Sequence, residues 1–239
     1  MHPVAIDDRV KFEVGYVEQR NRLTNAFRII LAIPHLVFSA LWGYAVEFAA
    51  VAQWFVIVFT GKRNRGIWEF QNGWLGYSGR VNAYVFQLYD PYPAFGDSAG
   101  DTPTRYSFSG QEPANRLTNA LRLIWAIPAL LFSMILTIGA FFVLFASWWV
   151  ILFTGKQPIG MFGFMQKVLR YSLQTNSYLF LMTDTYPKYD DQPGPTPFGP
   201  GPSGPGYAPS RYAQQPGAGT PLPPPPPQRS QQPPWNSPG

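Results

Sequence analysis

The stretch Asn21–Pro34 (NRLTNAFRIILAIP) decides the fold, because it returns 94 residues later as Asn115–Pro128 (NRLTNALRLIWAIP). The same offset, without a gap, aligns Phe59–Lys62 (FTGK) with Phe153–Lys156 (FTGK). Self-similarity at a fixed spacing indicates a tandem duplication, and it settles the architecture before any other signal does. The chain is therefore built from two equivalent units.

The boundaries of these units divide the chain into five segments. Residues 1–20 form an N-terminal extended segment, 21–93 repeat 1, 94–114 a linker with a second extended segment, 115–187 repeat 2, and 188–239 a tail. The tail consists mostly of Pro, Gly, Gln, Ser and Ala, so it cannot bury enough apolar surface to offset the entropy of ordering. We predict that it is disordered.

Each repeat opens into about thirty nearly uncharged residues, Ile29–Phe59 and Leu123–Phe153, which is longer than a bilayer crossing requires. The mean hydropathy of the whole chain is −0.08 only because the tail dilutes these two blocks. We therefore expect a mainly α, integral membrane protein.

A hairpin within each block fits the length of the block best. A straight helix from Leu23 to Phe59 would span roughly 55 Å, whereas the hydrocarbon core is about 30 Å thick. We predict helices at Leu23–Leu41 and Ala45–Phe59 with a turn near residues 42–44, and a matching turn near residues 137–139.

Charge placement supports this prediction, because basic residues stand at both ends of each block. The positive-inside rule then places both ends, and both chain termini, in the cytoplasm. The alternative is an in-plane amphipathic helix up to Pro34 followed by one tilted crossing, which would invert the second repeat. That alternative leaves one set of basic residues outside the cell. The basic residues are Arg22, Arg28, Lys62, Arg63, Arg65, Arg116, Arg122 and Lys156.

Two further elements are expected in each repeat. Val10–Tyr16 and Tyr106–Gly110 alternate polar and apolar residues, which predicts short strands that pair over one membrane face. Ile67–Leu88 and Met161–Met182 mix apolar and charged residues, which predicts amphipathic helices in the interface.

The residues that recur in both copies resemble a known bacterial family, the domain-of-unknown-function family 4389, over most of residues 10–187. The resemblance implies a bacterial plasma membrane protein, but it brings no established activity, cofactor or catalytic residue. The second copy departs from the family's pattern at Ala129 and Gln174, where the family has histidine and arginine. The resemblance rests on Asn21–Thr24, Leu31–His35, Phe59–Lys62, Arg80–Tyr84 and Tyr92–Pro93.

The sequence offers few groups for chemistry. Cysteine is absent, His2 is terminal and His35 stands alone in the first apolar block, so no metal site or cofactor is expected. The formal charge of +5 comes from residues beside the apolar runs, which favours anionic lipid headgroups over nucleic acid as the partner.

A non-enzymatic membrane scaffold is therefore the function that we predict. One alternative is a transporter or lipid-handling protein with a site between the repeats. Another is a membrane enzyme acting on a lipid phosphate, for which Arg28, Arg122, Asp90 and Asp184 form the polar set. The segment 221–227 (PLPPPPP) is either a polyproline II ligand that recruits a protein partner or part of a solvated tail.

One candidate site appears in both copies. On a helix that starts near Asn21, the side chains of Asn25 and Arg28 share a face, and Asn119 and Arg122 repeat that pair. An arginine inside an apolar helix costs free energy unless an anion meets it. We hypothesise that Arg28 and Arg122 each bind a lipid phosphate; the alternative is that they only enforce orientation.

Overall fold

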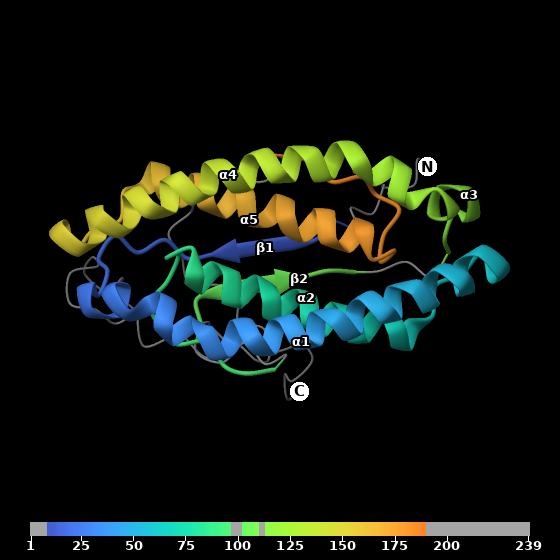
Figure 1. Ribbon diagram of the computed structural model, residues 1–239, viewed down its shortest axis with the longest axis horizontal. Helices are drawn as coiled ribbons and strands as arrows, with labels where there is room; N and C mark the ends of the chain where they lie inside the picture. The colour runs from blue at the N-terminus through green and yellow to red at the C-terminus, as the bar shows by residue number, and fades with distance from the viewer. Residues whose placement is uncertain (1–8, 97–101, 110–112, 190–239) are drawn as a thin grey trace, which may run out of the picture.

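The computed structural model describes residues 9–96, 102–109 and 113–189 (Figure 1). The tail, apart from residues 188 and 189, lies outside this description, and so does the prediction that it is disordered. The elements are β1 (Lys11–Val14), α1 (Arg22–Thr60), α2 (Arg65–Val85), β2 (Thr104–Ser107), α3 (Arg116–Ala120), α4 (Arg122–Thr154) and α5 (Ile159–Leu179).

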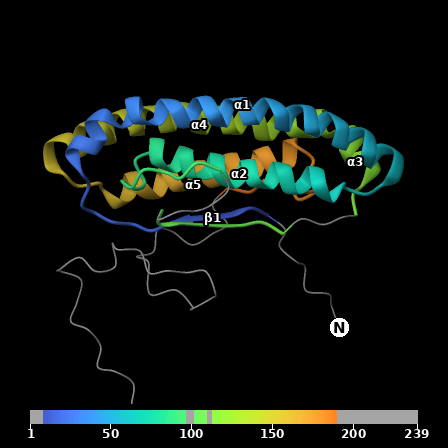
Figure 2. The ribbon, with the colours of Figure 1, turned by 90° about the horizontal axis from the view of Figure 1, so that it is seen from below.

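The described elements form three layers (Figure 2). The long helices α1 and α4 form one outer layer, α2 and α5 form the middle layer, and the two-stranded sheet of β1 and β2 forms the third. In each repeat the short second helix folds back along the long one. Trp74 on α2, for example, donates a hydrogen bond from Nε1 to the carbonyl of Ser39 on α1 at 2.9 Å.

The two repeats are related by a pseudo-twofold axis that passes between the strands. β1 and β2 are antiparallel, and Phe12 pairs with its own counterpart in the duplication, Tyr106. The long helices run in opposite directions along the molecule (Figure 1). Asn25 near the start of α1 and Trp148 near the end of α4 exchange two hydrogen bonds of 3.1 Å. The axis therefore runs through the three layers.

The turn that we predicted inside each apolar block is wrong. α1 is a single helix through residues 42–44, and α4 is a single helix through residues 137–139. One isolated glycine inside a helix costs only about 1 kcal/mol, so Gly43 does not break α1. Each long helix instead ends at a glycine in the left-handed conformation, Gly61 and Gly155, both with φ of 72°.

The helical hairpin of each repeat consequently joins α1 to α2 and α4 to α5, so the predicted transmembrane hairpins within the apolar blocks are absent. The length argument interpreted the excess of apolar residues as a turn, whereas α1 continues as one helix for 39 residues. In the second copy an irregular residue, Leu121, separates α3 from α4, which together correspond to α1.

The remaining elements overlap their predicted positions to different extents. β1 lies within the predicted strand and pairs with β2 as expected, but β2 shares only Tyr106 and Ser107 with its predicted range. α2 and α5 overlap the two predicted amphipathic helices. The environment of α2 and α5 is different from the one predicted, because both helices lie between two layers. Residues such as Leu75, Tyr77, Met165 and Leu169 are buried in the core.

The outer layer is apolar on its exposed side. α1 and α4 are each long and apolar enough to cross a membrane. Among the described residues, fifteen exposed large apolar side chains lie on α1 and fifteen on α4, against seven elsewhere. A soluble protein seldom exposes such a continuous apolar face.

Candidate functional site

Two equivalent polar clusters lie where each repeat closes. At the end of α2 the chain reverses through Gln87, which has a positive φ of 62°, and the N–H of Leu88 donates to the carbonyl of Ala83 at 2.9 Å. This is a Schellman-type helix end. The turn directs Asp90, three residues after Gln87, back to the start of α1.

The second repeat closes through the same backbone turn. Leu181 has a φ of 64°, and the N–H of Met182 donates to the carbonyl of Ser177 at 3.0 Å. The turn brings Asp184 to the start of α3. Both aspartates therefore reach a helix N-terminus, where unpaired N–H groups favour a negative charge.

The cluster of the first repeat is built around Arg28 and Asp90. Asp90 accepts hydrogen bonds from the Asn21 N–H at 2.9 Å and from Arg28 Nη2 at 2.6 Å. Arg28 Nη1 donates to the carbonyls of Tyr84 and Tyr89 at 2.8 and 2.6 Å. The Arg28 side chain is only 2% exposed. Its guanidinium is therefore held by protein groups at the turn after α2.

A second arginine, Arg20, joins this cluster from the segment before α1. Its Nη2 donates to the carbonyl of Leu88 at 2.7 Å, and its Nε donates to Oε1 of Gln157 at 2.9 Å. Burial lowers the pKa of the Arg20 guanidinium to about 10, while the charge of Asp90 opposes this shift. Arg20 thus stays cationic at neutral pH. Because Gln157 follows α4, the first cluster is completed by the second repeat.

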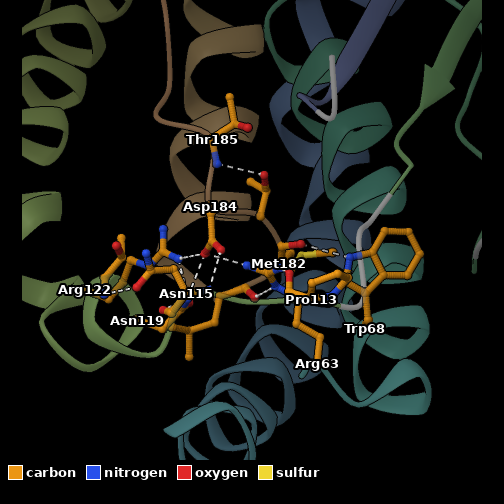
Figure 3. Close-up of polar contacts among 12 residues, drawn as sticks. Arg63, Trp68, Pro113, Asn115, Asn119, Arg122, Met182, Asp184 and Thr185 are labelled. Carbon is orange, nitrogen blue, oxygen red and sulfur yellow. Dashed lines mark hydrogen bonds and ion pairs between the residues drawn. The ribbon is translucent and has the colours of Figure 1, made fainter. Parts of the chain in front are cut away.

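The cluster of the second repeat gathers two arginines on one carboxylate (Figure 3). Asp184 Oδ1 accepts from Arg63 Nη2 at 2.6 Å, from Arg122 Nη2 at 2.7 Å and from Asn119 Nδ2 at 2.7 Å. Its Oδ2 accepts from the Asn115 N–H at 2.9 Å. These four donors fix the carboxylate at the start of α3.

Arg63 also ties the closing turn of the second repeat to the segment before α3. It donates from Nε to the carbonyl of Leu181 and from Nη1 to the carbonyl of Pro113, both at 2.7 Å. Since Arg63 follows α1, the second cluster is completed by the first repeat. The two repeats therefore hold each other at both ends.

The Asp184 carboxyl stays ionised in this setting. Burial acts to raise its pKa, but the Asn115 N–H, the charge of Arg63, the Asn119 amide and the charge of Arg122 together outweigh burial. The pKa of Asp184 consequently lies below its ordinary value. Two arginines and one aspartate give the cluster a formal charge of about +1.

The residues predicted for lipid binding fall into different environments. Arg28, Arg122 and Asn119 lie in the clusters, whereas the Nδ2 amide of Asn25 donates to the carbonyl of Trp148 in the other repeat. Arg122 is 2% exposed and stacks over the ring of Tyr178 at 3.9 Å. Within the described residues, its Nε and Nη1 have no hydrogen-bond partner.

Three participants were missed by the sequence reasoning, namely Arg20, Arg63 and Gln157. Comparison of the two copies could have identified these residues, because the duplication aligns Arg20 with Ala114 and Arg63 with Gln157. The first copy thus carries both of these arginines, and the second copy carries neither. The lone His35 is also placed by the structure: it is buried, its Nδ1 lies 2.8 Å from the Tyr77 hydroxyl, and its ring stacks on Phe95.

The fold and its clusters define a helical protein of two interlocked repeats, with two helices long and apolar enough to cross a membrane. The model of one family, described as Domain of unknown function (DUF4389), matches residues 22–96 and 116–189. The chain belongs to this family, as the sequence predicted, and it carries two copies of the domain. No curated protein and no solved structure matched it.

Proposed function

We propose that the protein is a non-enzymatic scaffold embedded in the bacterial plasma membrane. The observation that carries the proposal is the apolar outer layer, where α1 and α4 each expose fifteen large apolar side chains. Burying such a face in lipid stabilises the protein by roughly 25 cal/mol for each Å² removed from water.

The polar clusters support a structural role over a catalytic one. The carboxylates of Asp90 and Asp184 accept hydrogen bonds from backbone groups and from buried arginines of the same protein. A catalytic acid or base needs a free position from which it reaches a substrate. These carboxylates instead fasten the closing turns to the helices, as a rigid scaffold requires.

Membrane extraction tests this proposal. The chain should remain in the membrane pellet after washing with alkaline carbonate and dissolve only in detergent. A variant with Phe48→Glu and Phe142→Glu changes two equivalent, exposed positions of the outer layer and should shift a large fraction into the carbonate wash. Lys11→Glu, on the exposed side of β1, is the matched control and should stay in the pellet. Release of the parent chain by carbonate would refute membrane embedding.

A headgroup site is the second candidate, and the unpaired Nε and Nη1 of Arg122 favour it. Together with the formal charge of the cluster, these two donors suit the oxygens of a lipid phosphate, each on its own edge of the guanidinium. Replacing both Arg28 and Arg122 with lysine preserves charge but removes the planar guanidinium. Native mass spectrometry should then show loss of bound phosphatidylglycerol from the double variant. Equal retention in parent and variant would exclude the site.

Partner recruitment is the scaffold's proposed task, and the proline-rich segment 221–227 supplies its docking ligand. Affinity purification from native membranes, with the full chain and with a chain lacking residues 193–239, tests this part. A protein that co-purifies only with the full chain is expected. Identical sets of proteins from both preparations would contradict recruitment by the tail.

A further inference from the structure

The direction of the long helices relative to the membrane follows from the layers. We propose that α1 and α4 lie flat within the cytoplasmic leaflet, parallel to the bilayer plane, and that α2, α5 and the strands lie on its cytoplasmic side. The apolar face of α1 and α4 thus contacts the acyl chains of one leaflet. This inference rests on the proposed membrane embedding and deepens it.

Dimensions favour a flat orientation. α1 has 39 residues, so it is about 58 Å long, nearly twice the hydrocarbon thickness of about 30 Å. A single layer of helices is about 10–12 Å thick, which fits within one leaflet. The sequence prediction resolved the same mismatch with a turn that α1 does not contain.

The sheet argues against a crossing along the long axis of the molecule. Figure 2 shows β1 beneath the middle of the long helices, so helices that crossed the bilayer would carry the strands to its centre. The strands contain Lys11, Glu13 and Arg105, and Lys11 is exposed. A two-stranded sheet also has open edges, and hydrocarbon does not tolerate unpaired backbone groups. On the cytoplasmic side the strands meet water.

The positive charges at the two ends of the molecule also favour the flat orientation. Arg22 and Lys156 are exposed at one end, where α1 starts and α4 stops; Lys62 and Arg116 are exposed at the other. Because the two helices are antiparallel, a crossing would place one of these pairs outside the cell. A flat layer brings all four cations to the anionic headgroups of one leaflet, each contributing about 1 kcal/mol.

The curvature of the layer agrees with this charge distribution. Both long helices bow, and their ends turn toward the layer of α2 and α5 (Figure 2). The ends therefore approach the headgroups while the apolar middle lies deepest. Glu47, the one carboxylate on α1, is exposed but follows directly after the buried Val46. At 3.6 residues per turn it lies beside the buried stripe and not opposite it, at the edge of the layer.

Single cysteines test the orientation, since the chain has none of its own. Lys62→Cys and Lys156→Cys are equivalent, exposed positions at opposite ends of the molecule; Tyr44→Cys and Ile138→Cys are equivalent, exposed positions in the middle of the outer layer. A membrane-impermeant thiol reagent should label none of them in intact cells. After permeabilisation it should label only positions 62 and 156.

Each competing arrangement gives a different pattern. Labelling of one end position but not the other in intact cells would show crossing helices, and labelling of positions 44 and 138 would show hairpin tips. Either result would overturn the flat orientation. Every variant should resist carbonate extraction. If the protein is released as a soluble dimer, the apolar face belongs to a second copy, and membrane embedding itself has failed.

A depth profile provides the second measurement. Spin labels are placed at three exposed positions along α1, namely Ile30, Leu41 and Phe55. In vesicles of phosphatidylethanolamine and phosphatidylglycerol, the depth of each label in the bilayer is measured from its collision rates with oxygen and with a water-soluble nickel complex. The flat orientation predicts that all three labels lie in one leaflet, roughly 5–10 Å below the headgroups, with position 41 slightly deeper than 30 and 55 because α1 bows. A label at position 41 that lies at the bilayer centre, about 15 Å deep, with 30 and 55 at the headgroups would overturn it.

Discussion

Arg63, which follows the first long helix, and Asp184, at the close of the second repeat, are joined by an ion pair of 2.6 Å across 121 residues of sequence. The equivalent position in the other cluster has Gln157, and the cationic side chain there is Arg20. The second arginine of each cluster therefore comes from a different segment of the chain: Arg20 precedes α1, and Arg63 follows it. The two copies have diverged in which position supplies this positive charge.

Arg63→Gln should destabilise the protein, because it removes one partner of a largely buried ion pair. We expect a loss of about 1–3 kcal/mol, which is below the range for fully buried pairs because the Asp184 side chain is 31% exposed. Thermal melting in detergent measures the loss. Arg65→Gln, which removes an exposed pair with Glu69, is the control and should change stability by less than about 0.5 kcal/mol.

Because the two clusters take their second arginine from different positions, a second substitution should restore the stability that Arg63→Gln loses. Ala114 is the counterpart of Arg20, and the two residues donate equivalent backbone hydrogen bonds, to Gly61 and Gly155. Adding Ala114→Arg to Arg63→Gln should therefore rebuild the second cluster in the form of the first and recover at least half of the lost stability. If the double variant is no more stable than the single one, the clusters are not interchangeable.

The depressed pKa of Asp184 predicts a pH dependence. A carboxyl with a folded pKa below its unfolded value of about 3.9 stabilises the protein at higher pH, and this contribution is lost as the pH falls through the folded pKa. The difference in melting temperature between the parent and Asp184→Asn should thus be constant near neutral pH and shrink below about pH 4. A difference that grows on acidification would mean that the pKa is raised.

Local patterns could be predicted from the sequence, but contacts between the repeats could not. The repeat itself, the strand at Lys11–Val14 and the helix at Arg65–Val85 each leave a signal within a few residues. The ion pair of Arg63 leaves no such signal, because it depends on how two antiparallel repeats interlock. The turn predicted near Gly43 failed because an expected crossing direction was imposed on a helix whose neighbour, Trp74, packs against that glycine.

Close packing at the axis gives a prediction for Gly79. A Cβ at this position would lie 2.9 Å from the Phe12 ring and 3.2 Å from Leu173, its own counterpart in the duplication. Gly79→Ala should destabilise the protein by about 1–2 kcal/mol, since the buried ring has little room to move. Gly160→Ala, with no atom within 4 Å of the new methyl group, should be neutral or stabilising, and chemical denaturation in detergent compares the two. Equal effects would contradict the close approach.

The tyrosine pair Tyr77 and Tyr171 provides the most direct test of the buried histidine. Burial raises the pKa of Tyr77 to about 12, so its hydroxyl stays protonated and can donate to His35 Nδ1 at 2.8 Å. Tyr171, its counterpart, faces Ala129 and lies 3.5 Å from that residue's carbonyl. The duplication therefore contains the same hydroxyl with and without a histidine partner.

Tyr77→Phe leaves the buried His35 ring without its hydroxyl partner, and Nε2 has no other partner among the described residues. We expect a loss of about 1–3 kcal/mol, or a melting temperature lower by about 2–12 °C, against less than about 0.5 kcal/mol for Tyr171→Phe. In a His35→Ala background, which copies the second repeat, Tyr77→Phe should lose most of its effect because no buried nitrogen is left unpaired. A Tyr77→Phe effect that is unchanged in that background would assign the loss to packing and not to the hydrogen bond.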